Sequence, residues 1–259
     1  MRLHVHEWGD PGAPPLVCLH GVRGHGRVFR KLAEERLAAR FRVVAFDLRG
    51  HGRSDDDPPW DLGAHLEDLE DTADAHGLAR AVWLGHSFGG RLVMELVARA
   101  PERVERAVLL DPAIWAPPQT GRERAEGERP DRSYGSVEEA IVQRIVDSRL
   151  HHTPRALLAE EMDEHLLRSD DGRFRYRYCQ SSVVTAYGEM SKPPPDFSAL
   201  RLPTLLVRGA LTDVVPEIFL DVYREGVGDA LEVETVPGGH NVLWDAFAET
   251  ADAVERYLG

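Results

Sequence analysis

The sequence of 259 residues predicts an α/β protein in which helices flank a mostly parallel sheet. Short, continuously apolar runs alternate with segments whose apolar residues recur at helical spacing. Such runs are typical of parallel strands that are buried on both faces. The alternation stops between residues 113 and 199 and then resumes. This break indicates that a segment is inserted into the sheet scaffold.

The expected scaffold elements follow one another regularly up to residue 110. Leu3 and Val5 alternate with polar neighbours, which predicts a strand within residues 1–6 rather than a secretory signal. Leu62, Leu66 and Leu69 recur at helical spacing and predict a helix between two strands. The later strands of this half are expected at residues 16–19, 41–46, 81–84 and 108–110.

The segment 113–199 is expected to form a mainly helical cap, and residues 1–112 and 200–259 to form the core domain. Helices are expected at residues 136–150, 154–168 and 181–190. The polar stretch 121–132 is expected to be a loop or linker. Strands at 204–207 and 231–236, a helix from about Glu217 and a last helix complete the core.

The charge balance argues against several classes of protein. Lys and Arg number 31 against 44 Asp and Glu, giving a formal net charge of −13. A nucleic-acid binder needs a basic face, and an anionic membrane would repel this chain. No apolar run approaches the roughly 18 residues of a membrane span. The two cysteines, Cys18 and Cys179, make no disulfide framework, which favours a cytoplasmic location.

The strongest chemical signal is the motif Gly85-His86-Ser87-Phe88-Gly89. It follows an apolar strand and opens a helical pattern, which is the context that a G-x-S-x-G nucleophile requires. The tight turn between strand and helix leaves no room for side chains two residues before and after the serine, so both positions need glycine. The alternative is a serine that merely caps the helix. We interpret Ser87 as the catalytic nucleophile.

A serine hydroxyl needs a base, and the base needs a carboxylate to orient it. His240 follows the strand 231–236 through Pro-Gly-Gly and should lie at the same sheet edge as Ser87. Asp213 and Asp111 both follow apolar strands, and both satisfy the order nucleophile, acid, histidine. We favour Asp213, and interpret Asp111 as a turn-forming carboxylate before Pro112.

An oxyanion needs two preorganised donors. The backbone N–H of Phe88 begins the helix after the serine, where the helix dipole helps. The glycine-rich loop after strand 16–19 should supply the second, and Val22 N–H is the candidate. No H-E-x-x-H or comparable metal spacing occurs, and no cofactor is expected.

These motifs carry a resemblance to a known family. Leu19-His20-Gly21, the run from Asp47 to Ser54, the serine motif, Arg208-Gly209 with Asp213, and Gly239-His240 occur in the order seen in the α/β-hydrolase superfamily. The chain resembles that superfamily over essentially its whole length, and within it the capped serine esterases and lipases of actinobacterial type.

The resemblance implies an α/β-hydrolase fold with a helical cap inserted after strand six. It also implies a triad of Ser87, Asp213 and His240, with an oxyanion donor at Val22. The oxyanion loop has no Gly-Gly-Gly run, which in the family goes with small to medium acyl groups. Epoxide hydrolases and dehalogenases look similar but use an aspartate nucleophile, so Ser87 weighs against both.

The expected function is hydrolysis of small carboxylic esters through an acyl-enzyme. A lactonase, amidase, carbon–carbon bond hydrolase or cofactor-free perhydrolase could use the same triad, and a non-catalytic receptor could keep the fold. Selectivity should come from the cap, because the triad is common to all of these enzymes. Leu158 and Met162 are the cap residues expected to bind substrate. The sequence does not indicate an oligomeric state.

Overall fold

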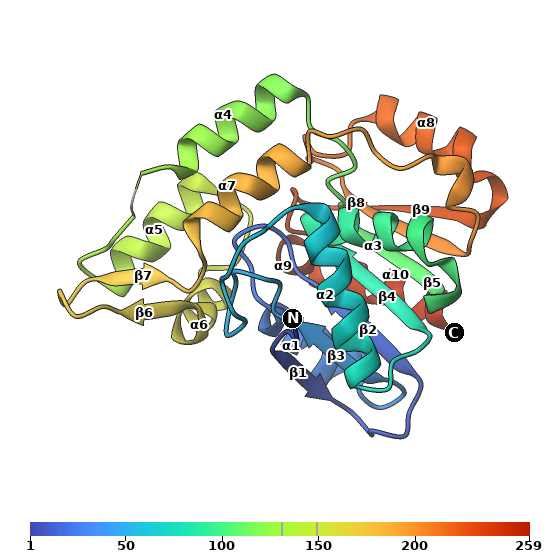
Figure 1. Ribbon diagram of the computed structural model, residues 1–259, viewed down its shortest axis with the longest axis horizontal. Helices are drawn as coiled ribbons and strands as arrows, with labels where there is room; N and C mark the ends of the chain where they lie inside the picture. The colour runs from blue at the N-terminus through green and yellow to red at the C-terminus, as the bar shows by residue number, and fades with distance from the viewer. Residues whose placement is uncertain (131, 149) are drawn as a thin grey trace.

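The structure is a computed structural model that describes residues 1–130, 132–148 and 150–259 (Figure 1). A seven-stranded sheet runs in the order β1-β3-β2-β4-β5-β8-β9. Strand β1 pairs with β3 antiparallel, and the other pairings in this sheet are parallel, which confirms the predicted class. The strands are β1 (Val5–Trp8), β2 (Pro15–Leu19), β3 (Arg42–Phe46), β4 (Ala81–His86), β5 (Val104–Leu110), β8 (Thr204–Gly209) and β9 (Leu231–Val236).

Helices cover both faces of the sheet, so both faces are buried. Successive strand residues point to opposite faces and therefore enter two different apolar clusters. In β2, Val17 and Leu19 join one apolar cluster, and Leu16 and Cys18 join the other. The first cluster lies under α2 (Leu62–Ala75), α3 (Phe88–Arg99) and α8 (Glu217–Val227). The second lies under α1 (Arg30–Leu32) with its flanking turns η1 (Gly26–Phe29) and η2 (Ala33–Leu37), and under α9 (Val242–Asp245) and α10 (Phe247–Leu258). Short turns η3 (Pro101–Arg103) and η5 (Gly228–Ala230) lead into β5 and β9.

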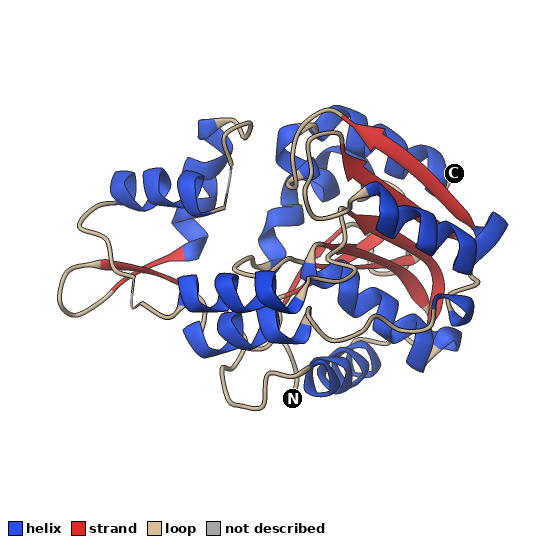
Figure 2. Ribbon diagram, turned by 90° about the horizontal axis from the view of Figure 1, so that it is seen from above, coloured by secondary structure: helices blue, strands red, loops and turns tan. Residues whose placement is uncertain are grey.

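The inserted segment, residues 113–199, connects β5 to β8. It holds α4 (Pro118–Glu128), α5 (Val137–Asp147), α6 (Arg155–His165), the hairpin β6 (Leu166–Arg168) and β7 (Phe174–Tyr176), α7 (Gln180–Glu189) and η4 (Phe197–Ala199). The hairpin and its helices project to one side of the sheet in both views (Figures 1 and 2). The resemblance implied insertion after strand six, but in this chain five strands precede it.

Two expectations about this segment were wrong. The stretch 121–132 was expected as a loop, yet α4 covers Pro118–Glu128. Arg, Glu and Ala have good helix propensity even where apolar periodicity is missing. The helix expected at 154–168 ends at His165, because the next three residues pair with β7. Residues 131 and 149, within the expected loop 121–132 and helix 136–150, lie outside the described residues.

The inserted segment has an apolar cluster of its own. Its buried members are Tyr134, Ala140, Ile141, Leu150, Leu158, Met162 and Tyr176. The hydroxyl of Tyr176 donates to the carbonyl of Ala140 over 2.9 Å, so the hairpin is tied to α5. Among the described residues, no helix combines the length and apolar character that crossing a membrane requires.

Candidate active site

Ser87 occupies the strained turn between β4 and α3. Its φ of 53° and ψ of −116° lie where non-glycine residues are rare. A Cβ at Gly85 would overlap the backbone of Gly89, and a Cβ at Gly89 would overlap the carbonyl of Leu19. The two glycines therefore allow a turn that a side chain at either position would block. The turn carries Ser87 past the end of its strand, as the motif predicts.

His240 links Ser87 to a carboxylate. Its Nε2 lies 2.9 Å from Ser87 Oγ, and its Nδ1 lies 2.6 Å from Asp111 Oδ2. An ionised carboxylate only accepts hydrogen bonds, so Nδ1 carries the proton toward Asp111. In the neutral ring, Nε2 then has the free lone pair and accepts from the serine hydroxyl. This is the tautomer that a general base for Ser87 needs.

Asp111 directly follows β5 and is held there by buried hydrogen bonds. Its side chain is fully buried, and its N–H donates to the carbonyl of Val207 over 2.7 Å. Oδ1 accepts from Gly209 N at 3.0 Å, and Oδ2 accepts from Thr212 Oγ1 at 2.6 Å as well as from His240. Its φ of 43° turns the carboxylate toward the histidine. Three donors thus compensate the buried negative charge.

The preference for Asp213 as the partner of His240 is corrected by this geometry. Asp213 lies on the exposed β8–α8 loop and lines the cavity above Ser87. Asp111, which we interpreted as a turn residue, accepts the Nδ1–H bond. Both residues follow parallel strands, so chain order could not separate them. The missed signal is adjacency: Asp111 directly ends β5, which pairs with β4, whose end carries Ser87.

Two buried histidines hold the loops around this triad. His86 Nε2 lies 3.0 Å from the carbonyl of His240, and burial lowers the pKa of His86 to about 4. His20 Nδ1 lies 2.8 Å from the carbonyl of Gly21, and its Nε2 accepts from Leu48 N at 3.0 Å. Burial holds the pKa of His20 well below its usual range. Both rings are therefore neutral, and their hydrogen bonds fix the positions of the loops that they join. Sequence reasoning did not assign either role.

The two expected oxyanion donors lie near Ser87. Phe88 is the first residue of α3, and the N–H groups of the first turn have no partner within a helix. Val22 lines the same cavity as Ser87. In the described part of the chain, neither N–H donates a hydrogen bond to another protein group. Both are therefore available to a substrate oxygen.

Arg23, next to Val22, ties the oxyanion loop to the inserted segment. It is buried and has a φ of 61°. Its guanidinium lies 3.2 Å from Glu128 Oε1 and donates to Ser148 Oγ over 2.9 Å. Its carbonyl accepts from both terminal nitrogens of Arg144 at 3.2 Å. The backbone beside the oxyanion donor is thus fixed by contacts with α4 and α5.

A cavity of about 660 Å³ lies over Ser87, between the sheet edge and the inserted segment. Trp115, Tyr187 and Met190 of the inserted segment contribute to its walls. Leu158 and Met162, the two residues expected to bind substrate, are buried in the inserted segment's own cluster. Among the described residues, the cavity walls do not include them.

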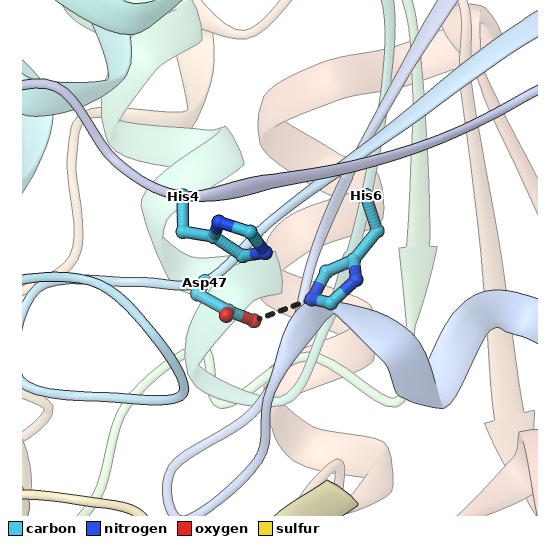
Figure 3. A group of neighbouring side chains, drawn as sticks. All are labelled: His4, His6 and Asp47. Carbon is cyan, nitrogen blue, oxygen red and sulfur yellow. Dashed lines mark hydrogen bonds and ion pairs between the residues drawn. The ribbon is translucent and has the colours of Figure 1, made fainter.

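His4, His6 and Asp47 are grouped closely enough to suggest a metal site, but their bonds indicate a structural role (Figure 3). Asp47 Oδ1 accepts from Gly26 N at 2.6 Å and lies 3.2 Å from His6 Nε2. Its Oδ2 accepts from Arg53 N at 2.9 Å. Hydrogen bonds that fix the loop after β3 already occupy both carboxylate oxygens. Their donors also hold the pKa of Asp47 well below its usual range despite burial.

Comparison with known proteins identifies the family. A family model described as the alpha/beta hydrolase fold matches residues 14–247, so the chain belongs to this family and is a hydrolase. It is 31% identical to Lipase LipV of Mycobacterium tuberculosis, over 99% of this chain and 98% of that protein. It is 29% identical to the 3-hydroxybutyrate-oligomer hydrolase of Cupriavidus necator, over 100% of this chain and 93% of that protein.

Solved structures support the fold. The crystal structure of E-2-(acetamidomethylene)succinate hydrolase matches with a TM-score of 0.88 at 22% identity. The match covers 99% of this chain and 94% of that one. The resemblance predicted from the sequence motifs is therefore confirmed at the level of the family and the fold.

Proposed function

We propose that this hydrolase cleaves carboxylic esters of small to medium acyl length through an acyl-enzyme on Ser87. The observation that carries the proposal is the continuous hydrogen-bond path from Asp111 through His240 to Ser87 Oγ. Lipase and esterase names among the relatives support an ester substrate. A lactone or amide would meet the same three residues, so a substrate panel has to separate them.

In the proposed reaction, the serine, the histidine, the aspartate and two backbone N–H groups each have one role. Ser87 Oγ attacks the ester carbonyl as His240 Nε2 takes its proton, and buried Asp111 stabilises the imidazolium. The N–H groups of Val22 and Phe88 donate to the oxyanion. His240 then protonates the departing alkoxide. Water, activated by the same nitrogen, releases the acid and restores Ser87.

We also propose that the inserted segment acts as a cap domain over a core of residues 1–112 and 200–259. Its helices contribute one wall of the cavity above Ser87, while the triad residues all belong to the core. This division makes the cap the source of selectivity. A cytoplasmic location remains part of the proposal, supported by Cys18 and Cys179, which are both free thiols.

The test is replacement of the nucleophile. Ser87→Ala should lower kcat for an activated short-chain ester by about 10⁴- to 10⁶-fold. The wild-type protein should release the chromophoric alcohol in a burst whose amplitude equals the enzyme concentration. Retention of more than a few per cent of wild-type turnover by a pure, folded variant would refute the mechanism. Binding of esters without turnover by the wild-type protein would favour a receptor instead.

A further inference from the structure

The arginines that line the cavity differ in whether an acidic side chain pairs with them. Three arginines line it, namely Arg23, Arg124 and Arg144. Arg23 lies 3.2 Å from Glu128, and Arg144 lies 3.1 Å from Glu161. Arg124 has neither an ion pair nor a hydrogen bond to any residue that the structure describes. One positive charge on the cavity wall therefore has no protein counterion there.

The acidic residues on the cavity wall do not cancel this charge. Asp147 forms an ion pair with Arg132 and accepts from Gln143 over 2.9 Å. Asp213 lies in the exposed loop after β8, outside the inserted segment that carries Arg124. The buried acid of the triad, Asp111, already accepts three hydrogen bonds. A negatively charged ligand is the partner that Arg124 still lacks.

The packing of α4 on α7 directs Arg124 toward the cavity. Gly121 is buried between these helices, where an added Cβ would lie 2.9 Å from the carbonyl oxygen of Tyr187 and would overlap Ser191 Oγ. The close approach that glycine permits brings the two helices side by side, as Figure 1 shows. Thr120, Gly121 and Arg124 share one face of α4, and all three line the cavity.

Tyr187 supplies a neutral donor beside this guanidinium. Burial raises the pKa of Tyr187, while the nearby charges of Arg23 and Arg124 oppose that shift. The phenol therefore keeps its proton and can donate a hydrogen bond. In the described part of the chain its hydroxyl forms no hydrogen bond to another protein group, and the residue lines the cavity. A guanidinium and a phenol on adjacent helices thus face the same space.

We propose that Arg124 and Tyr187 form a subsite for a carboxylate carried on the acyl part of the substrate. The ester that Ser87 attacks would then be a monoester of a dicarboxylic acid. This inference rests on the proposed ester hydrolysis and adds a substrate class to it. A carboxylate would gain charge-assisted hydrogen bonds from both groups, whereas a neutral acyl chain would leave the guanidinium to water.

The experiment compares two esters of equal length, the mono-4-nitrophenyl ester of adipic acid and 4-nitrophenyl hexanoate. In the wild-type protein, kcat/KM should favour the charged ester. Hydrogen bonds to a charged group correspond to about a 10- to 100-fold change, and Arg124→Gln should lower the charged-to-neutral ratio by that factor. Arg124→Glu should lower the ratio further, and Tyr187→Phe should lower it several-fold.

Arg122→Gln is the matched control, because Arg122 is an exposed neighbour on α4 that is not part of the cavity wall. This control should keep the wild-type ratio. Added salt should reduce the wild-type preference and have little effect on the ratio of Arg124→Gln.

The outcomes separate this inference from the proposed function. If Ser87→Ala retains hydrolysis of both esters, the proposed function fails. If hydrolysis depends on Ser87 but Arg124→Gln and Arg122→Gln give the same ratio as the wild type, the carboxylate subsite is refuted. An equal fall of kcat/KM for both esters in Arg124→Gln would also refute it, since that result indicates only a structural role for the side chain.

Discussion

The sheet edge and the inserted segment enclose one cavity, but their geometry has different origins. At the sheet edge, strand register fixes the residues: His86 pairs with Leu110, and Ser87 N donates to the carbonyl of Leu110 over 3.1 Å. Helices α5 and α6 and the hairpin of the inserted segment instead pack around their own apolar cluster and meet the sheet edge at points such as Arg23. The chemical groups are therefore positioned by the backbone of the sheet. The wall that the inserted segment contributes is shared, since Met190 packs in the core cluster of the sheet while Leu150 belongs to the segment's own cluster.

The sharpest test of this difference uses the two carboxylates. Asp111→Asn should lower kcat for an activated ester by about 10⁴-fold, because His240 loses the acceptor that fixes its tautomer. Asp213→Asn should lower kcat by no more than a few-fold, because Asp111 already accepts the Nδ1–H bond. Steady-state kinetics with both folded variants measures the contrast. The reverse order of effects would return the orienting role to Asp213.

The fold could be predicted from the sequence, and so could the proximity of Ser87 and His240, whose Oγ and Nε2 lie 2.9 Å apart. Ser87 lies in a motif whose glycines have a steric cause, and His240 lies on the loop after a recognisable strand. The choice between Asp111 and Asp213 could not be made, because it depends on strand order and on three donors that chain order does not reveal.

The inserted segment was less predictable for a different physical reason. Its helix α4 has no apolar periodicity, and it packs through Gly121 rather than through an apolar stripe. The apolar spacing in α6 predicts which residues are buried. It does not predict whether they face the cavity or the segment's own cluster. Leu158 and Met162 illustrate this, because they face the segment's own cluster.

Substitutions of two methionines compare a residue of the cavity wall with a residue of the inserted segment's cluster. Met190 lines the cavity, and Met190→Ala should move the preferred acyl length upward by about one or two carbons. Each methylene that the enlarged cavity buries contributes about 0.8 kcal/mol, or roughly a four-fold change in kcat/KM. Hydrolysis of a graded series of 4-nitrophenyl esters measures the shift.

Met162→Ala is the matched control, because Met162 is buried in the inserted segment's cluster. It should destabilise the protein by about 2–5 kcal/mol without moving the preferred length. If Met162→Ala moves the optimum and Met190→Ala does not, the division between wall and cluster is wrong.

The smallest expected effect concerns stability in acid. Burial lowers the pKa of His86 and His51 to about 4 and of His65 to about 3. Because these values lie below the usual pKa of about 6.5, the unfolded chain binds more protons than the folded one in this range. The contribution of these three histidines to the free energy of unfolding is greatest above about pH 6.5 and is lost as the pH drops toward 4. Thermal unfolding should therefore show a lower Tm at about pH 4 than at about pH 6.5.

His65→Phe tests the cause of the acid sensitivity. Neither ring nitrogen of His65 has a hydrogen-bond partner among the described residues, and its ring lies 5.4 Å from that of Phe88. An apolar ring in its place should make the fall in Tm with pH shallower. An unchanged slope would show that His65 does not contribute to it.

The anchoring of Asp111 also bears on how this chain tolerates changes in length. The carboxylate follows β5 directly, and its partners on the neighbouring strand end are Gly209 and Thr212. Residues 213–216 lie beyond the last of these contacts and lead into α8. Asp213, Val214 and Pro216 line the cavity, so substitutions of their side chains would change one of its walls while the bonds of Asp111 to Gly209 and His240 stay set by the sheet. Changes in loop length are more restricted, because Val215 is buried in the core and Val214 N–H donates to Thr212 Oγ1.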